Sequence, residues 1–244
     1  MKVLFLITAR GGSKGVPGKN LREIGGISLV GFKALSARQS RHCDRLIIST
    51  DCAKIQQDAL KYGVEVPFTR PAELATDTAK SGPVISHAMD WIEAEGRQAY
   101  DAVMLLEPSS PFAKARDYDG AIETMVRTGA NAVVAVRPSD VSSTVIGPLD
   151  SEGRLTAVLD KMHAALSQTG QRQTLGSEYT MSGAFYLFKW DYFKRHNWIY
   201  QDRLGVYGYP MDAIHSVEID EPIHLLWAEF LVEQGHISIA EWRV

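Results

Sequence analysis

The stretch Val3–Asn20, VLFLITARGGSKGVPGKN, decides how the rest of the chain is organised. It starts with an apolar run, Val3–Ile7, and such a run ending near glycines predicts a buried strand that opens into a loop. Glycine lets the backbone approach a ligand closely and turn successive N–H groups toward one concavity, and nearby cations then suit a polyphosphate. The cations of this loop are Arg10, Lys14 and Lys19. The stretch therefore predicts a phosphate-binding loop after the first strand.

This loop does not follow the two most familiar phosphate-binding patterns. Aligning Gly18-Lys19 with the Walker pattern places Ser13 where the first glycine is required and Asn20 where serine or threonine is required. The pattern G-x-G-x-x-G is absent from the loop as well. The alternative is a glycine-rich surface turn with solvated charges. The coincidence of strand, glycines and cations at the start of an α/β pattern favours the phosphate site.

Segments with strand and helix character alternate along most of the chain. Helices are expected at residues 28–39, 53–62, 81–95, 116–127, 190–196 and 223–234, and strands at 45–50, 64–68, 101–106, 130–136, 184–188 and 205–209. Near-continuous apolar strands alternating with helices predict an α/β fold with a doubly wound, mostly parallel sheet and ligands at its carboxyl edge. The length suits a single domain over residues 1–244.

Composition argues against several classes of protein. A formal net charge of −3 disfavours a general binder of nucleic acid or anionic membranes. The cysteines, Cys43 and Cys52, form neither a disulfide framework nor a zinc pattern. Without an apolar stretch of about 18 residues or a cleavable leader, we expect a soluble cytoplasmic protein with no nucleic-acid or membrane partner.

The alternation is interrupted over residues 137–182, which prolines and glycines punctuate. Only residues 155–159 resemble a short strand there. A structureless loop of this length is uncommon in a compact domain, so hairpins packed on another surface are expected.

Acidic residues lie at two further places of interest. Asp51 directly follows the strand 45–50, where it would either cap the next helix or reach the site. Glu218 and Asp220 stand two apart on a segment expected to be extended, so both carboxylates would face one side and Ile219 the core. Mg²⁺ binds one or two carboxylates together with substrate phosphates, so this pair suits a metal on the triphosphate; the alternative is a solvated strand end.

The loop also carries a family resemblance. Residues 9–20, ARGGSKGVPGKN, resemble the signature loop of the CMP-sialic acid synthetases, the acylneuraminate cytidylyltransferases. Further matches are RPAELA at 70–75, Asp77-Thr78, Ser81, PSSP at 108–111 and the acid-x-acid pair at 218–220. Enzymes that activate the related sugar KDO typically carry Ser-Arg-Leu-Pro-Gly-Lys-Pro in the loop, so Lys14-Gly15 and Asn20 favour the sialic-acid branch.

The resemblance implies a Rossmann-like nucleotidyltransferase fold and assigns roles to individual residues. CTP would be bound by Arg10, Gly11, Gly12, Ser13, Lys14, Lys19, Asn20, Arg70 and Ser81. The sugar acid would be bound by Glu107, Ser109 and Ser110, and Mg²⁺ by Asp220 with Glu218. Arg10, Lys19 and Asp220 are the expected catalytic residues. A homodimer is implied, in which residues 137–182 act as a dimerisation extension and complete the partner's sugar pocket.

The sequence departs from the family at the sugar side. Glu107 stands where the sialic-acid enzymes usually have Gln, Glu218 where Asp is usual, and Thr180–Gly183 where they often have Arg-Pro-Asn-Gly. An anionic Glu107 and a missing arginine would weaken capture of the usual acidic sugar, so another nonulosonic acid is expected. The expected reaction is attack of the anomeric hydroxyl of the sugar acid on the α-phosphorus of CTP, giving the CMP-sugar and pyrophosphate. KDO or another sugar acid as acceptor, and a non-catalytic CTP-binding subunit, stay open as alternatives.

Overall fold

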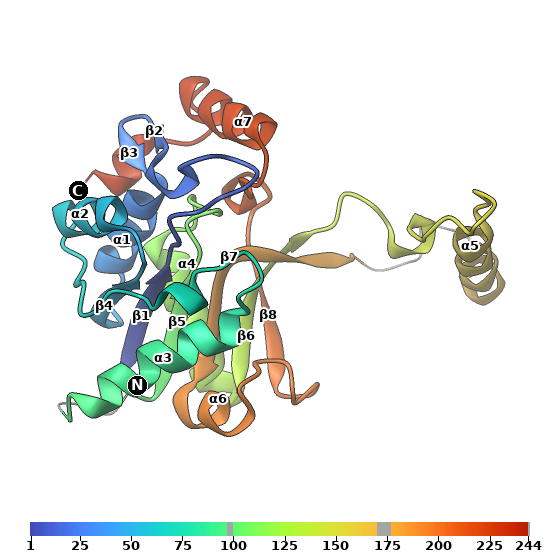
Figure 1. The fold of residues 1–244 in the computed structure, drawn as a ribbon. Coiled ribbons are helices and arrows are strands. Elements are labelled where there is room, and N and C mark those ends of the chain that lie inside the picture. The colour runs from blue at the N-terminus through green and yellow to red at the C-terminus, as the bar shows by residue number, and fades with distance from the viewer. Residues whose placement is uncertain (97–99, 170–176, 244) are drawn as a thin grey trace.

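The computed structural model describes residues 1–96, 100–169 and 177–243, and a six-stranded sheet in the order β4-β1-β5-β7-β6-β8 forms its centre (Figure 1). The strands are β1 (Val3–Thr8), β4 (Cys43–Ser49), β5 (Ala102–Leu106), β6 (Ala132–Pro138), β7 (Tyr179–Lys189) and β8 (Val206–Pro210). β7 runs antiparallel to β5 and β6, and the other neighbouring strands pair in parallel. The predicted doubly wound, mostly parallel α/β sheet is confirmed.

Helices cover both faces of this sheet because the side chains of its central strands alternate between two cores. On β1, Val3, Phe5 and Ile7 pack with α1 (Leu29–Gln39), α2 (Ala53–Lys61) and α4 (Ala115–Thr128). Leu4 and Leu6 point the other way, toward α3 (Ser81–Ala94) and α6 (Trp190–His196). The strand predicted at the start of the chain is therefore buried on both faces.

A third apolar cluster lies beside the sheet, under α7 (Pro222–Glu233) and the small hairpin of β2 (Glu23–Ile24) and β3 (Ile27–Ser28). It contains Val16 from the glycine-rich loop and Ile219 from the acidic segment, and both side chains are buried. The cluster thus places two segments that are far apart in the sequence on a common apolar base.

Residues 139–178 leave the body of the molecule between β6 and β7 and form an arm, drawn in yellow in Figure 1; residues 170–176 lie outside the described part. The arm carries η3 (Ser143–Val145) and the helix α5 (Thr156–Thr169). The strand predicted at 155–159 is wrong, because a short apolar run alone does not distinguish a strand from a helix, and residues 156–159 of this run begin α5. The hairpins predicted for residues 137–182 are also wrong over the described part of the arm.

The strand predicted at residues 64–68 does not form. Of residues 64–68, only Glu65 makes a β-bridge, to Ile47. Residues 217–221, expected to be extended, follow η5 (Ile214–Ser216) and lead into α7 without joining a sheet. The backbone is extended at Val217 and Glu221, Ile219 is buried, and Glu218 and Asp220 line one hollow, as predicted. In the part of the chain that the structure describes, no helix combines the length and the apolar character needed to cross a lipid bilayer.

Candidate active site

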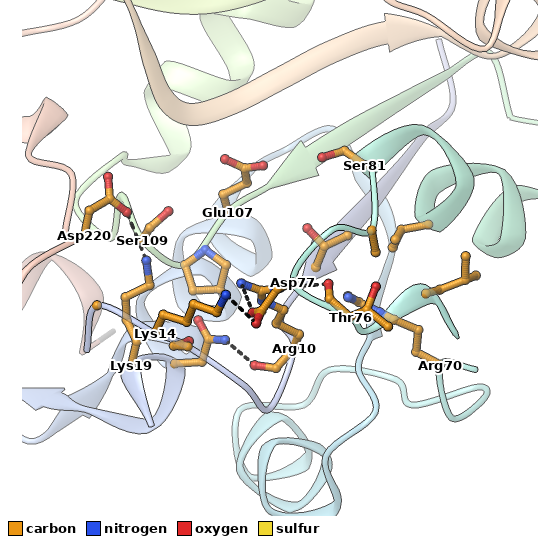
Figure 2. Close-up of a pocket in the computed structure, with 18 of the residues that line it drawn as sticks. Arg10, Lys14, Lys19, Arg70, Thr76, Asp77, Ser81, Glu107, Ser109 and Asp220 are labelled. Atoms are coloured by element: carbon orange, nitrogen blue, oxygen red, sulfur yellow. Dashed lines mark hydrogen bonds and ion pairs between the residues drawn. The ribbon is translucent and has the colours of Figure 1, made fainter. Parts of the chain in front are cut away.

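A cavity of about 420 Å³ lies at the carboxyl ends of β1 and β5 (Figure 2). Its walls come from the glycine-rich loop, from residues 70–81, from the turn after β5 and from Asp220. We call it the main cavity. Among the predicted site residues, those on its wall are Arg10, Ser13, Lys14, Lys19, Asn20, Arg70, Ser81, Glu107, Ser109 and Asp220. The expected edge of the sheet is therefore the place where these side chains meet.

Two loop cations converge on one carboxylate at the mouth of the main cavity. Arg10 Nη2 lies 3.2 Å from one oxygen of Asp77 and Lys14 Nζ 2.9 Å from the other. Arg10 Nη1 also donates a hydrogen bond to Thr76 O at 2.8 Å. The hydrogen bond from Lys14 lowers the pKa of the Asp77 carboxyl. An anionic group is thus held between two cations here, which is the arrangement that a phosphate would require.

Lys19 joins the loop to the acidic segment. Its Nζ donates to Ile219 O at 2.8 Å and lies 3.2 Å from Asp220 Oδ1. The Lys19 side chain is 17% exposed and that of Asp220 61% exposed, so the cation is sheltered while the carboxylate faces solvent. A Cβ atom on Gly15 would lie 2.0 Å from Asp220 O, so only glycine permits this close approach.

The shape of the loop depends on polar contacts at its base. Asn20 Nδ2 donates to Arg10 O at 2.9 Å and closes the loop across its two ends. Gly11 N donates to Asp51 Oδ1 at 2.8 Å. Helix α2 begins after Cys52, so the interpretation of Asp51 as its cap is wrong. Gly11 and Gly12, which were predicted to bind the nucleotide, belong to the loop but do not line the main cavity.

Arg70 and Ser81 form the wall opposite Lys19. Arg70 is buried and donates from Nε to Ser49 Oγ at 3.0 Å and from Nη2 to Ser49 O. Burial lowers the pKa of this guanidinium to about 10. Ser81 is the first residue of α3. Figure 2 shows Arg70 at the end of the cavity far from Asp220. Cationic side chains therefore lie at both ends of the cavity, Lys19 at one and Arg70 at the other.

A second cavity of about 170 Å³ adjoins the first, and we call it the aromatic cavity. Glu107 and Ser81 lie on the walls of both. Its other walls include Tyr186, Trp198 and Tyr200. Ser109 lines the main cavity but not the aromatic cavity. The Oγ atom of Ser110 is buried and has no hydrogen-bond partner within the described residues, and Ser110 lines neither cavity.

Glu107 on the walls of both cavities and Lys33 in the core behind them both have strongly shifted pKa values. Burial, and secondly the charge of Glu218, raise the pKa of the Glu107 carboxyl to about 7 against the opposing effect of Lys33. Lys33 is fully buried, and its Nζ donates to Ala184 O at 2.7 Å. Burial lowers the pKa of its ammonium to about 7, while the charge of Glu107 opposes that shift. Each group therefore stabilises the charged form of the other.

Replacing Glu107 by Gln is expected to change how stability depends on pH. The carboxyl pKa is raised from 4.5 to about 7 on folding, so the folded chain binds more protons in this range and loses stability as the pH rises. The unfolding free energy of Glu107→Gln minus that of the wild type should therefore rise by about 2 kcal/mol as the pH is raised from about 5 to 7. Urea unfolding at both pH values measures this. The exposed Glu233→Gln is the control, and a pH-independent difference for Glu107→Gln would contradict the assignment.

Asp220 and Glu218 are not equally well placed to bind a divalent cation. Asp220 lines the main cavity beside Lys19. Asp220 also lines a neighbouring hollow of about 540 Å³, and Glu218 lines that hollow but not the main cavity. Glu218 lies against Gly183, where a Cβ would come within 2.5 Å of its Oε1. No group of three or more His, Cys, Asp or Glu side chains suited to a metal occurs within the described residues. Since Mg²⁺ typically takes one or two carboxylates and completes its shell with phosphates and water, Asp220 fits better than Glu218.

A family model described as Cytidylyltransferase matches residues 4–237. The chain belongs to this family. The cytidylyltransferase is therefore an enzyme of the nucleotidyltransferase class, as the loop resemblance implied. The match covers the sheet, the loop and the acidic segment, so the main cavity lies within the part of the chain that defines the family.

Several known proteins are similar to this cytidylyltransferase. It is 28% identical over 244 residues to "Post-translational flagellin modification protein B" of Campylobacter coli, with 99% of each chain covered. It is 37% identical over 157 residues to "CMP-N,N'-diacetyllegionaminic acid synthase" of Legionella pneumophila, covering 64% of this chain and 66% of the other. A solved CMP:2-keto-3-deoxy-manno-octonic acid synthetase complexed with CTP shares the fold, with a TM-score of 0.68 and 15% identity over 96% of this chain and 100% of the other.

Sequence reasoning missed several residues that shape the site of this cytidylyltransferase. Asp77 was noted only as part of a motif, although its charge beside a cationic loop was a usable signal. The aromatic cavity was missed because Trp198 and Tyr200 lie in an irregular stretch with no periodicity. Lys33 was missed because it interrupts the apolar face of a helix, where a lysine is usually assigned to solvent.

Proposed function

We propose that this cytidylyltransferase transfers CMP from CTP to a nonulosonic, sialic-type sugar acid and releases pyrophosphate. The contact between Lys19 and Asp220 carries the proposal, because it puts a phosphate-binding cation and a candidate metal ligand 3.2 Å apart on one cavity wall. The similarity to a CMP-N,N'-diacetyllegionaminic acid synthase supports the choice of acceptor. CTP is a nucleotide of the cytosol, so the proposed location is the cytoplasm.

The proposed reaction needs positioning and charge neutralisation more than a protein nucleophile. Arg10, Lys14 and Lys19 would bind the β- and γ-phosphates, with the α-phosphorus toward Glu107 and Ser109. The anomeric oxygen of the sugar acid would form the new bond to the α-phosphorus while its hydroxyl proton leaves to solvent, and the bond from that phosphorus to the bridging oxygen of pyrophosphate would break. Mg²⁺, which Asp220 would hold, supplies positive charge that offsets the charge growing on the leaving pyrophosphate.

The aromatic cavity is the proposed place for part of the sugar acid. It adjoins the main cavity through Ser81 and Glu107. A sugar acid whose anomeric carbon faces the α-phosphorus in the main cavity would therefore extend its other end into the aromatic cavity. Small-molecule sites commonly combine apolar walls with a few polar groups that fix orientation. Tyr186, Trp198 and Tyr200 would supply those walls.

Release of pyrophosphate tests the proposed function. The purified chain is incubated with CTP, Mg²⁺ and a panel that contains several nonulosonic acids and KDO. We expect release with at least one nonulosonic acid at a rate well above that with KDO. Faster release with KDO would support the KDO alternative. Binding of CTP in calorimetry without release for any acid would support a non-catalytic nucleotide-binding subunit.

A homodimer is the second part of the proposal. The arm exposes the large apolar side chains Val141, Val145, Ile146, Leu149, Leu155 and Leu159. Helix α7 exposes another apolar set, Ile223, Leu226, Trp227 and Phe230. Apolar surfaces of this kind mark sites of protein association. Because Figure 1 shows the arm extending away from its own body, a second copy of the chain is the partner that we propose for it.

The double variant Leu155→Asp, Leu159→Asp is expected to be monomeric. Both side chains are about half exposed in the single chain, so charge there costs little in folding but opposes burial in an interface. Sedimentation should give one chain mass of 27.0 kDa for the variant and twice that mass for the wild type. Leu60→Asp, an exposed leucine on α2, is the control. A monomeric wild type would rule out the proposed dimer.

A further inference from the structure

Glu107 stands at the junction of the main and aromatic cavities. It follows β5 directly, and the hydrogen bond from Ser110 N to Glu107 O, at 3.2 Å, closes the turn that presents it. Figure 2 shows its side chain between those of Ser109 and Ser81. A ligand that extends from one cavity into the other must therefore pass this carboxyl group.

A fully buried cation lies behind Glu107. Lys33 of α1 reaches through the core, and its Nζ donates to Ala184 O of β7. A fully buried ammonium is costly unless an anion is near, and Glu107 is the anion whose charge acts on it most strongly. The other charges that act on Glu107 are Lys19, Glu218 and Asp220. The chain thus keeps a buried counter-charge for a carboxylate on the cavity wall.

The aromatic cavity presents a carboxyl group and aromatic ring surfaces, and both suit a cation. Among the described residues on its wall, Glu107 is the acidic one, and no Lys or Arg lines it. Tyr186, Trp198 and Tyr200 contribute ring surfaces. Aromatic faces attract cations through their quadrupole, and an ionised carboxylate accepts hydrogen bonds but donates none. A positively charged nitrogen group matches both features.

We propose that Glu107, together with the aromatic cavity, selects sugar acids that carry a cationic nitrogen substituent over sugar acids whose substituent is neutral. This inference rests on the proposed function and names the substrate class within it. Lys33 acts as a positioning residue, because it supplies the counter-charge for Glu107 without reaching either cavity. The carboxylate of Glu107 would pair with the substituent, and the aromatic side chains would pack around it.

Matched acceptors test the inference. The first pair is the N-glycyl and N-propionyl derivatives of neuraminic acid, which differ only in a terminal NH3⁺ or CH3. The second pair is the 9-amino-9-deoxy and 9-deoxy forms of N-acetylneuraminic acid. The wild type should favour the amine in at least one pair by about 10-fold or more in kcat/KM, measured by pyrophosphate release. Glu107→Gln should abolish that preference, while Glu233→Gln should retain it.

Lys33→Met separates positioning from a structural role. Without its counter-cation, Glu107 loses part of its negative charge, so the preference for the amine should fall. In a chain that already carries Glu107→Gln, Lys33→Met should leave the preference for the amine unchanged, because Lys33 acts only through the charge of the Glu107 carboxylate. Additive effects of Lys33→Met and Glu107→Gln on the preference would remove Lys33 from the proposal.

Binding distinguishes failure of this inference from failure of the proposed function. Trp198 lines the aromatic cavity, so its fluorescence reports the dissociation constants of the acceptors directly. If no acid releases pyrophosphate, the proposed function fails, and the ratio of dissociation constants within each pair still decides the selectivity. Equal dissociation constants and equal kcat/KM within both pairs for the wild type would overturn the inference.

Discussion

The Lys19→Met variant is expected to lose at least about 100-fold in kcat/KM for CTP while it stays folded. Lys19 is the most sheltered cation of the loop, and its Nζ is fixed by Ile219 O and Asp220. A cation held rigidly beside a bound triphosphate stabilises charge that grows on the leaving group without reorganisation. Methionine keeps the length and apolar stem of the side chain but removes that charge. Pyrophosphate release measures the loss.

Stability should change little in this variant. The ion pair that it removes has a largely exposed carboxylate, and such pairs contribute roughly 0 to 1 kcal/mol. The hydrogen bond to Ile219 O, which is also lost, contributes about 1 kcal/mol. Circular dichroism and a urea midpoint close to that of the wild type would verify the fold. Lys54→Met, an exposed lysine on α2, controls for the loss of a surface charge. Turnover within tenfold of the wild type would contradict the role of Lys19 in phosphate binding.

Local patterns predicted the sheet because each strand carries its own signal. β1 is apolar at every position from Val3 to Ile7, as burial on both faces requires, and helices of the right period follow most strands. The arm could not be predicted in this way. The apolar residues of α5 find few partners within one chain, so their spacing does not lead to the core packing that sequence patterns usually indicate.

The site was predictable only in part, because its contacts connect residues far apart in the sequence. The loop motif identified the cations, and the spacing of Glu218 and Asp220, strengthened by the resemblance, identified the acidic pair. That Gly15 lies against Asp220 O, and that Asp77 lies between Arg10 and Lys14, depends on how loops close over the sheet edge. Glu107 was expected at the sugar site, but its pairing with buried Lys33 left no sequence signal, because that lysine alone resembles a solvated charge.

The Asp220→Asn variant should lose about 100-fold or more in kcat/KM and should bind Mn²⁺ more weakly in the presence of CTP. Asparagine keeps the size of the side chain and can still accept a hydrogen bond from Lys19, but it lacks the charge that a hard divalent cation requires. Mn²⁺ serves as the probe for the proposed Mg²⁺, since its free concentration is read by electron paramagnetic resonance. This readout does not depend on turnover.

Comparison with Glu218 makes the test of Asp220 specific. Glu218 lines the neighbouring hollow instead of the main cavity, so Glu218→Gln should weaken Mn²⁺ binding much less than Asp220→Asn. Asp212→Asn controls for the loss of a negative charge, because it removes a largely exposed carboxylate that also precedes α7 in the chain. Equal weakening by Glu218→Gln would mean that both carboxylates hold the metal. Unchanged Mn²⁺ binding in Asp220→Asn would exclude Asp220 as a ligand and leave its contact with Lys19 as its role.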